Sequence, residues 1–269
     1  MNAILYYSNS HKKINGTLFY CFEYFIWLKQ YLPDIKYFLI NTDLDDLELF
    51  KSVFREKYIF DESFLDDIIP LTKYTDFMKL TVDNLMVLDV NSYTKMRPFM
   101  GKVKSVRVYS NDNHDFLDKK PRHTFYGWYD EYQDYNKRVR LKLYKESHRT
   151  YVNRGDKVFV SSPKCDAMSV VDAVGLDREG VFIKKGNEHN NNLFESINEI
   201  VYWHTGKDTN NRIVVEAYIH DIPLKVYYNG NLSDSIKERC DVIGNGNAHE
   251  LFLDDSDIMI KDFVDDCKN

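Results

Sequence analysis

Residues 3–40 have the sequence AILYYSNSHKKINGTLFYCFEYFIWLKQYLPDIKYFLI. Two short apolar runs, Ala3–Tyr7 and Ile35–Ile40, have the length and composition of buried strands. Between them, Thr17–Tyr31 has an aromatic-rich helical pattern, and Pro33 marks the end of that pattern. A strand–helix–strand order favours a parallel sheet with right-handed crossover connections. We therefore expect an α/β fold.

The remainder of the chain continues the alternation of strands and helices. Short apolar runs predict further strands, and a helix over Asn211–His220 precedes the last of them. The acidic stretch over residues 41–83 is predicted to be helical, with charges that form a solvated face. The predicted strands are Asn84–Val90, Ser105–Tyr109, Lys157–Val160, Gly180–Lys184, Glu199–Trp203 and Leu224–Tyr228.

The chain of 269 residues is long enough for two α/β domains. We expect a first domain over residues 1–155, a second over 156–250 and an acidic C-terminal helix over 251–269. The N-terminus lacks the basic-then-apolar pattern of a signal peptide, and the most apolar stretch is too short to cross a bilayer. A soluble, intracellular protein is therefore expected.

The four cysteines are widely spaced in the sequence and form no Cys-x-x-Cys pair. A zinc site needs clustered ligands, and a disulfide framework needs a high density of cysteines, so neither is indicated. We expect reduced thiols. The cysteines are Cys21, Cys165, Cys240 and Cys267.

The net charge of -6 is distributed unevenly along the chain. Thr94–Lys157 holds 16 Lys and Arg against 8 Asp and Glu, a net charge of +8, and the rest of the chain carries -14. The basic segment also contains eleven aromatic residues, which suits phosphate neutralisation combined with base stacking. The alternative is a basic helix over Asn136–Arg149 that is solvated on one side. The candidate DNA-binding residues are Lys95, Arg97, Lys119, Lys120, Arg122, Trp128, Lys137, Arg138 and Arg140.

A second group of polar residues follows the predicted strand Glu199–Trp203. Ligands of open α/β sheets bind outside the carboxyl ends of the strands, and helix N-termini favour phosphate. His204 and Lys207 lie in the turn after this strand, and Arg212 and Glu216 lie four residues apart near the start of the predicted helix. The arginine can neutralise a diphosphate, and the carboxylate can accept hydrogen bonds from two ribose hydroxyls. The alternative is an ordinary surface ion pair.

The stretch Arg212-Ile-Val-Val-Glu216-Ala, followed by Ile222-Pro-Leu, resembles the nucleotide-sugar site of GT-B glycosyltransferases. In that family a Glu-Ala helix precedes a strand of the C-terminal domain. The resemblance implies two Rossmann-like α/β lobes of GT-B type with a cleft between them. It also implies that Glu216 holds the ribose and Arg212 the diphosphate of a nucleotide sugar. Further donor contacts consistent with this resemblance are Lys184, Lys185, His204 and Lys207.

Two strand ends in the first half are similar to consecutive strand ends of T-even-type phage DNA glucosyltransferases. They are Val87-Leu-Asp-Val-Asn-Ser92 and Val106-Arg-Val-Tyr-Ser-Asn-Asp112. Those enzymes carry an Asn-Ser pair after one strand and a catalytic Asp after the next. The resemblance implies that Asp112 is the general base that deprotonates the acceptor hydroxyl. His114 is the alternative base, because the ordinary pKa of histidine lies near neutrality. A plain surface turn around Asp112 is the non-catalytic interpretation.

These resemblances, which extend to phage enzymes that attach arabinose to hydroxymethylcytosine, predict a glycosyltransferase. It would move a pentose or hexose, arabinose or glucose, from a nucleotide-diphosphate sugar such as a UDP-sugar. The acceptor would be hydroxymethylcytosine, or a sugar already on it, in double-stranded phage DNA. The expected protein is a monomer in the cytoplasm of the infected bacterium and has no membrane partner.

Three questions stay open at the level of sequence. Asp255-Ser-Asp257 has the form of an Asp-x-Asp metal motif but lies in the C-terminal tail, so the need for a divalent metal is undecided. The acceptor could instead be a cell-surface glycan or a lipid-linked sugar, which predicts no salt-sensitive binding to DNA. The chain could also be a non-catalytic nucleic-acid-binding protein, which predicts that no donor is bound.

Overall fold

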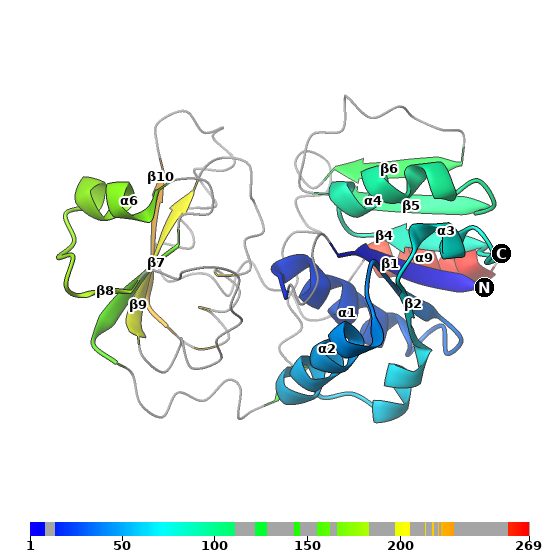
Figure 1. The fold of residues 1–269 in the computed structure, drawn as a ribbon, viewed down its shortest axis with the longest axis horizontal. Coiled ribbons are helices and arrows are strands. Elements are labelled where there is room, and N and C mark those ends of the chain that lie inside the picture. The colour runs from blue at the N-terminus through cyan, green and yellow to red at the C-terminus, as the bar shows by residue number, and fades with distance from the viewer. Residues whose placement is uncertain are drawn as a thin grey trace. The chain divides into compact units, whose positions relative to one another are not determined.

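The structure is a computed structural model of the chain and describes residues 1–8, 14–110, 122–127, 143–145, 155–161, 166–182, 197–204, 213, 217, 220, 222–228 and 258–268. By contacts, the chain divides into two compact units (Figure 1). The first contains Met1–Tyr135 and Asp255–Asn269, and the second contains Asn136–Asp254. The C-terminal segment therefore belongs to the first unit. The boundary between the two units in the sequence follows residue 135, earlier than the expected boundary at residue 155.

The first unit is built on a six-stranded sheet in which every neighbouring pair of strands is parallel. The strand order is β3-β2-β1-β4-β5-β6, so the chain builds outward from β1 in one direction and then from β4 in the other. The strands are β1 (Asn2–Tyr7), β2 (Lys36–Ile40), β3 (Ile68–Leu71), β4 (Asn84–Val87), β5 (Ser105–Ser110) and β6 (His123–Gly127).

Helices cover both faces of this sheet. Right-handed crossovers that travel in opposite directions across a sheet place their helices on opposite faces, so α1 and α4 lie on different sides. The helices of the first unit are α1 (Gly16–Leu28), α2 (Leu44–Lys57), α3 (Tyr74–Phe77), α4 (Val90–Met96) and α9 (Ile258–Lys268), with short 3-10 helices η1 (Glu62–Asp67) and η2 (Arg97–Phe99).

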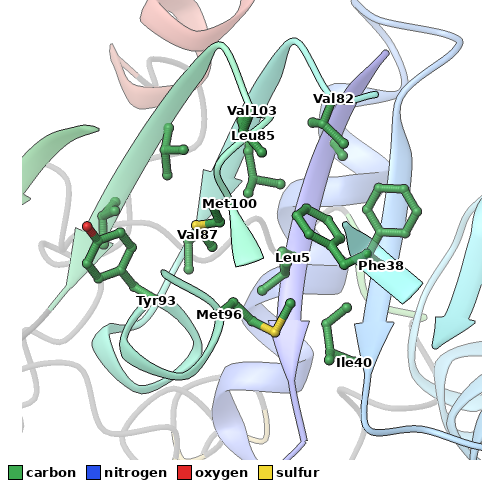
Figure 2. Packing of buried hydrophobic residues seen from close by; sticks show 14 residues of the cluster. Leu5, Phe38, Ile40, Val82, Leu85, Val87, Tyr93, Met96, Met100 and Val103 are labelled. Carbon is green, nitrogen blue, oxygen red and sulfur yellow. The ribbon is translucent and has the colours of Figure 1, made fainter. Parts of the chain in front are cut away.

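The core on the α4 face joins all the central strands to α4. Alternate residues of β1, β2, β4 and β5 point to this face, as the period of two in a strand requires. Tyr93 and Met96 of α4 pack on them, and Figure 2 shows both side chains in one cluster with Leu5, Phe38 and Val87. All five are at most 2 % exposed, which makes this face a dry core.

The opposite face of the sheet carries α1 and α9. Arg107 of β5 lies between Val106 and Val108, which belong to the core on the α4 face, so its side chain points to the other side. There its Nε donates to the carboxylate of Asp266 over 2.5 Å, and its Nη1 lies 3.8 Å from Asp262. This pairing of a central strand with the last helix explains why the C-terminus belongs to the first unit (Figure 1).

The contact between α1 and α2 is an aromatic cluster. Phe22 of α1 stacks on Phe54 of α2, with ring centroids 3.7 Å apart and an interplanar angle of 2°. Phe60 meets the ring of Phe22 edge to face at 5.2 Å. Tyr58 donates a 2.6 Å hydrogen bond from its hydroxyl to the buried carboxylate of Glu23, which satisfies a charged group inside this cluster.

The second unit contains a four-stranded parallel sheet with the order β10-β9-β7-β8. Phe159 and Ile200 face one apolar cluster, and the next residues, Val160 and Val201, face another together with α6. Two covered faces are what a parallel sheet requires. The described elements are β7 (Lys157–Ser161), α6 (Ala167–Val174), β8 (Val181–Phe182), β9 (Ile197–His204) and β10 (Leu224–Tyr228).

The α/β fold class and most of the expected strands are confirmed, because long apolar runs were sufficient to locate them. Two expectations were wrong. The strand expected to continue to Val90 ends at Val87, because Asp89 caps α4. The stretch over residues 41–83, expected to be helical, contains strand β3 besides its helices. The basic segment also contains strand β6, which was not among the expected strands. Within the described part of the chain, no helix is long and apolar enough to cross a membrane.

Candidate functional site

The candidate site of the first unit lies where the order of strands reverses. β1 and β4 are neighbours, but their following helices leave in opposite directions, and in open α/β sheets such a reversal is where a crevice forms outside the carboxyl ends of the strands. Such switch points are the usual ligand-binding position of open α/β sheets. The polar residues that follow β1 and β4 are therefore the first to examine.

Ser92 ties the two sides of this switch point together. The backbone N–H of Tyr7, the last residue of β1, donates to the Ser92 Oγ over 2.9 Å. The Ser92 N–H donates in turn to the Asp89 carboxylate over 2.7 Å, which caps the N-terminus of α4. Ser92 is completely buried, whereas Asn91 beside it is exposed. The expected Asn-Ser pair thus divides into one residue that shapes the crevice and one that faces solvent.

Asn15 performs the corresponding task for α1. Its Oδ1 accepts from the Leu18 N–H over 3.0 Å, and its Nδ2 donates to the Tyr6 hydroxyl over 2.9 Å. Burial raises the pKa of Tyr6, and the nearby negative charge of Asp89 raises it further. Tyr6 therefore keeps its proton and can act only as a neutral hydrogen-bonding group.

The N-terminus of α1 contributes positive charge at this switch point, and Asp89 contributes negative charge. The first turn of α1 contains no acidic residue, so the positive end of the helix dipole is not neutralised within the helix. Glycine occupies the first position of the helix, at Gly16, and leaves room for close approach to the backbone. On the side of α4, the acidic residue is Asp89, which caps the N-terminus of that helix.

The expected general base follows the next strand of the sheet in the sequence. β5 lies beside β4 and ends at Ser110, and Asp112 and His114 follow Ser110 in the sequence. Both candidate bases lie outside the residues that the structure describes. The strand that precedes them ends at the same edge of the sheet as β4, because the two strands are parallel.

The second unit has a switch point of its own. β7 is followed by α6 and β8 on one side, whereas β9 and β10 lie on its other side, so the reversal falls between β7 and β9. His204 is the last residue of β9 and therefore ends at this edge. Ile213 and Ala217 are helical and pack on the sheet, in agreement with the expected helix. Outside the described residues lie Lys184, Lys185, Lys207, Arg212 and Glu216.

The basic candidates that the structure describes lie near the opposite, amino-terminal edge of the first sheet. Lys95 is exposed in the last turn of α4, Arg97 begins η2, and Arg122 immediately precedes β6. The structure thus brings Arg97 and Arg122 together although 25 positions separate them in the sequence. Outside the described residues lie Lys119, Lys120, Trp128, Lys137, Arg138 and Arg140.

Metal-binding and thiol chemistry find little support among the described residues. No group of three or more His, Cys, Asp or Glu side chains there could hold a metal ion. Cys21 and Cys267 are free thiols, and burial raises the pKa of both, so neither is an activated nucleophile. Cys165, Cys240 and the motif at residues 255–257 lie outside the described part.

Sequence reasoning missed Asn15, Asp89 and the core role of Ser92. The signal for the two caps was available, since Asn or Asp three residues before a helical N–H is the usual N-cap arrangement. No local signal could reveal the bond from Ser92 to Tyr7, because it joins positions 85 residues apart.

Replacement of Ser92 tests the connection across the crevice. We expect Ser92→Ala to lower the free energy of unfolding by about 1–3 kcal/mol, because the partly buried Tyr7 N–H loses its acceptor, the fully buried Ser92 hydroxyl. The cap from Asp89 survives, since it uses the backbone of residue 92. Thr94→Ala, an exposed change in the same helix, is the matched control and should alter stability by less than about 0.5 kcal/mol. Urea denaturation of both variants measures the difference, and equal midpoints would contradict the assigned role.

Comparison with known proteins leaves the chain without an assigned family. No protein-family model matches it, and no curated protein is significantly similar to it.

Proposed function

We propose that the protein is a glycosyltransferase of GT-B type that modifies DNA. It transfers a pentose or hexose from a nucleotide-diphosphate sugar, a UDP-sugar, to hydroxymethylcytosine in double-stranded DNA or to a sugar already on that base. The observation that carries the proposal is the presence of two separate parallel α/β sheets, each with its own topological switch point. One switch point can bind a donor and the other can present the acceptor.

The second unit is the proposed donor unit. His204 ends β9 at the switch point, and the helical positions Ile213 and Ala217 belong to the segment that follows. Arg212 and Glu216 directly precede these two positions in the sequence. An arginine near a helix start neutralises the diphosphate, and a carboxylate one turn later holds the ribose.

The first unit is the proposed acceptor unit. β5 ends at the edge where β4 and β1 also end, and Asp112 follows β5 in the sequence. Asp112 takes the proton of the acceptor hydroxyl as that oxygen attacks the anomeric carbon. Neutralisation of the departing diphosphate and deprotonation of the acceptor are the two electrostatic tasks of the reaction. A base in a duplex is reached by flipping, which costs a few kcal/mol, and aromatic side chains of the basic segment compensate by stacking.

Mass spectrometry of nucleosides tests this function directly. Duplex DNA that contains hydroxymethylcytosine is incubated with a panel of nucleotide sugars, and the expected product is a nucleoside heavier by one pentosyl or hexosyl group. Plain duplex DNA is the control and should stay unmodified. A mass shift only on glycan or lipid-linked acceptors would identify the alternative glycosyltransferase, and DNA binding without any transfer would indicate a non-catalytic protein.

Donor binding gives a separate prediction. Arg212→Ala and Glu216→Ala should each weaken the affinity for UDP about tenfold or more, because each removes a charge-assisted hydrogen bond. Arg178→Ala is the control in the same unit, since Arg178 is exposed and pairs with Asp172. Isothermal titration measures the affinities. If both donor variants bind UDP as tightly as the control, the donor site lies elsewhere.

A further inference from the structure

A pocket of about 290 Å³ opens at the amino-terminal edge of the first sheet. It lies between the turn that follows η2 and the start of β6, on the edge opposite to the carboxyl ends of the strands. The described lining residues are Arg97, Pro98, Met100, Gly101, Val103, Arg122 and His123.

The pocket combines an apolar base with a cationic rim. Met100 and Val103 are at most 3 % exposed and belong to the core cluster, as Figure 2 shows, so the base of the pocket is rigid. Arg97 and Arg122 contribute two guanidinium groups, and none of the described lining residues is acidic. His123 is held by a 2.7 Å hydrogen bond between its Nδ1 and the hydroxyl of Tyr93, which is fully buried.

The carboxylate of Asp83, which precedes β4 at this edge, is already paired with other cations. Asp83 forms ion pairs with Lys104 and with the N-terminal amine. The hydrogen bond from Lys104 and that from the amine lower the pKa of Asp83 to about 2. The positive charge of the pocket is therefore not cancelled by this neighbour.

We propose that this pocket binds a backbone phosphate of DNA at a distance from the base that is modified. Two arginines that line one small pocket supply the positive charge that a phosphate requires, and arginine is a common phosphate-binding residue. Exposed Lys95 and Lys102 extend the positive surface beside it, which suits a continuous backbone better than a single small anion. The inference rests on the proposed function for the identity of the nucleic acid.

The length of the sheet sets the position of this contact along the DNA. From Ser105 to Ser110, β5 spans about 17 Å at 3.3–3.4 Å per residue. Duplex DNA rises about 3.4 Å per base pair, so this length corresponds to about five base pairs. A duplex that presents its modified base at the carboxyl end of β5 and follows the sheet therefore reaches the pocket about five base pairs away.

Gly101 offers a direct test, because a side chain can be added there without strain. A Cβ built at Gly101 meets no atom within 4 Å, and its φ is not in the left-handed region. Gly101→Asp thus introduces a negative charge at the pocket, and Gly101→Ala is the matched control for the added carbon. Arg97→Ala with Arg122→Ala removes the positive charge, and Arg55→Ala on α2 is the control for loss of an exposed arginine elsewhere in the unit.

Filter binding over a salt series measures the result on a duplex with hydroxymethylcytosine at its centre and about ten base pairs on each side. We expect Gly101→Asp and the double arginine variant to bind about tenfold more weakly or worse at low salt. Loss of one phosphate contact should also reduce the slope of log K against log salt by about 0.9. Gly101→Ala and Arg55→Ala should match the unaltered protein. On a duplex cut to about three base pairs on each side, the effect of Gly101→Asp should disappear.

The outcomes separate this inference from the proposed function. If Gly101→Asp and the double arginine variant both keep the DNA affinity and the salt dependence of the unaltered protein, the inference is overturned, even if sugar transfer occurs. Sensitivity that persists on the short duplex would overturn the stated spacing. Absence of DNA binding by the unaltered protein would overturn the inference and the proposed acceptor together. Binding that depends on the pocket, without transfer of any sugar, would support the pocket and contradict the proposed catalysis.

Discussion

Asp112→Asn is expected to reduce the turnover of sugar transfer about 100- to 10,000-fold. The substitution keeps the shape of the side chain but removes the carboxylate that takes the proton of the acceptor hydroxyl. Asp112 follows the end of β5 by two residues in the sequence, and β5 lies next to β4 in the sheet. Because the acceptor proton must leave as the new bond forms, loss of the base should lower kcat and leave the affinity for the donor unchanged.

His114→Ala is the comparison that decides between the two candidate bases. If Asp112 is the base, His114→Ala should keep most of the turnover, and the two variants should unfold at the same temperature. Sugar transfer by each variant, from a saturating UDP-sugar to a saturating hydroxymethylated duplex, is followed by mass spectrometry. Near-normal turnover in Asp112→Asn together with its loss in His114→Ala would assign the base to the histidine instead.

Phe22→Ala is expected to destabilise the first unit by about 3–5 kcal/mol. Phe22 is completely buried and stacks on Phe54 at 3.7 Å, while Tyr58 and Phe60 enclose its other sides at 5.5 and 5.2 Å. Truncation removes the ring that stacks on Phe54 and leaves a cavity among the surrounding aromatic rings, which relax only partly. A loss of this size is a large share of the stability of an ordinary domain.

Leu44→Ala provides the matched control for this prediction. Leu44 begins α2 and is 70 % exposed, so its truncation should change the free energy of unfolding by less than about 0.5 kcal/mol. Urea denaturation, followed by circular dichroism, compares the midpoints of the two variants. A shift for Phe22→Ala no larger than that for Leu44→Ala would mean that the aromatic cluster contributes little to the stability of the unit.

Strands β3 and β6 are two elements that the local sequence pattern did not predict. β3 (Ile68–Leu71) is a four-residue strand that pairs with β2 and lies at the edge of the sheet, where its Pro70 is tolerated. Because its apolar run is so short, the sequence pattern did not distinguish this strand from the helical stretch around it. β6 lies within the basic segment and becomes a strand because it pairs with β5. In both places the partner strand determined the conformation, and the partner is distant in sequence.

The candidate site was predictable only in part for a related reason. The ends of β5 and β9 follow from apolar runs, so the residues after them could be named in advance. The pocket at Gly101 could not be named, because it forms only when the turn before β5 meets the residue before β6. The charge of the basic segment was visible in the sequence, but not that Arg97 and Arg122 line the same pocket.

The amino-acid sequence by itself determined the α/β class, most of the strands and the helix α1, because hydrophobic periodicity and caps act between residues a few positions apart. Only the tertiary structure decided the strand order, the reversal between β1 and β4 and the return of α9 to the first unit. These depend on contacts such as that of Arg107 with Asp266, which are 159 residues apart. Such contacts are selected by packing and charge pairing in the folded chain, and no local pattern encodes them.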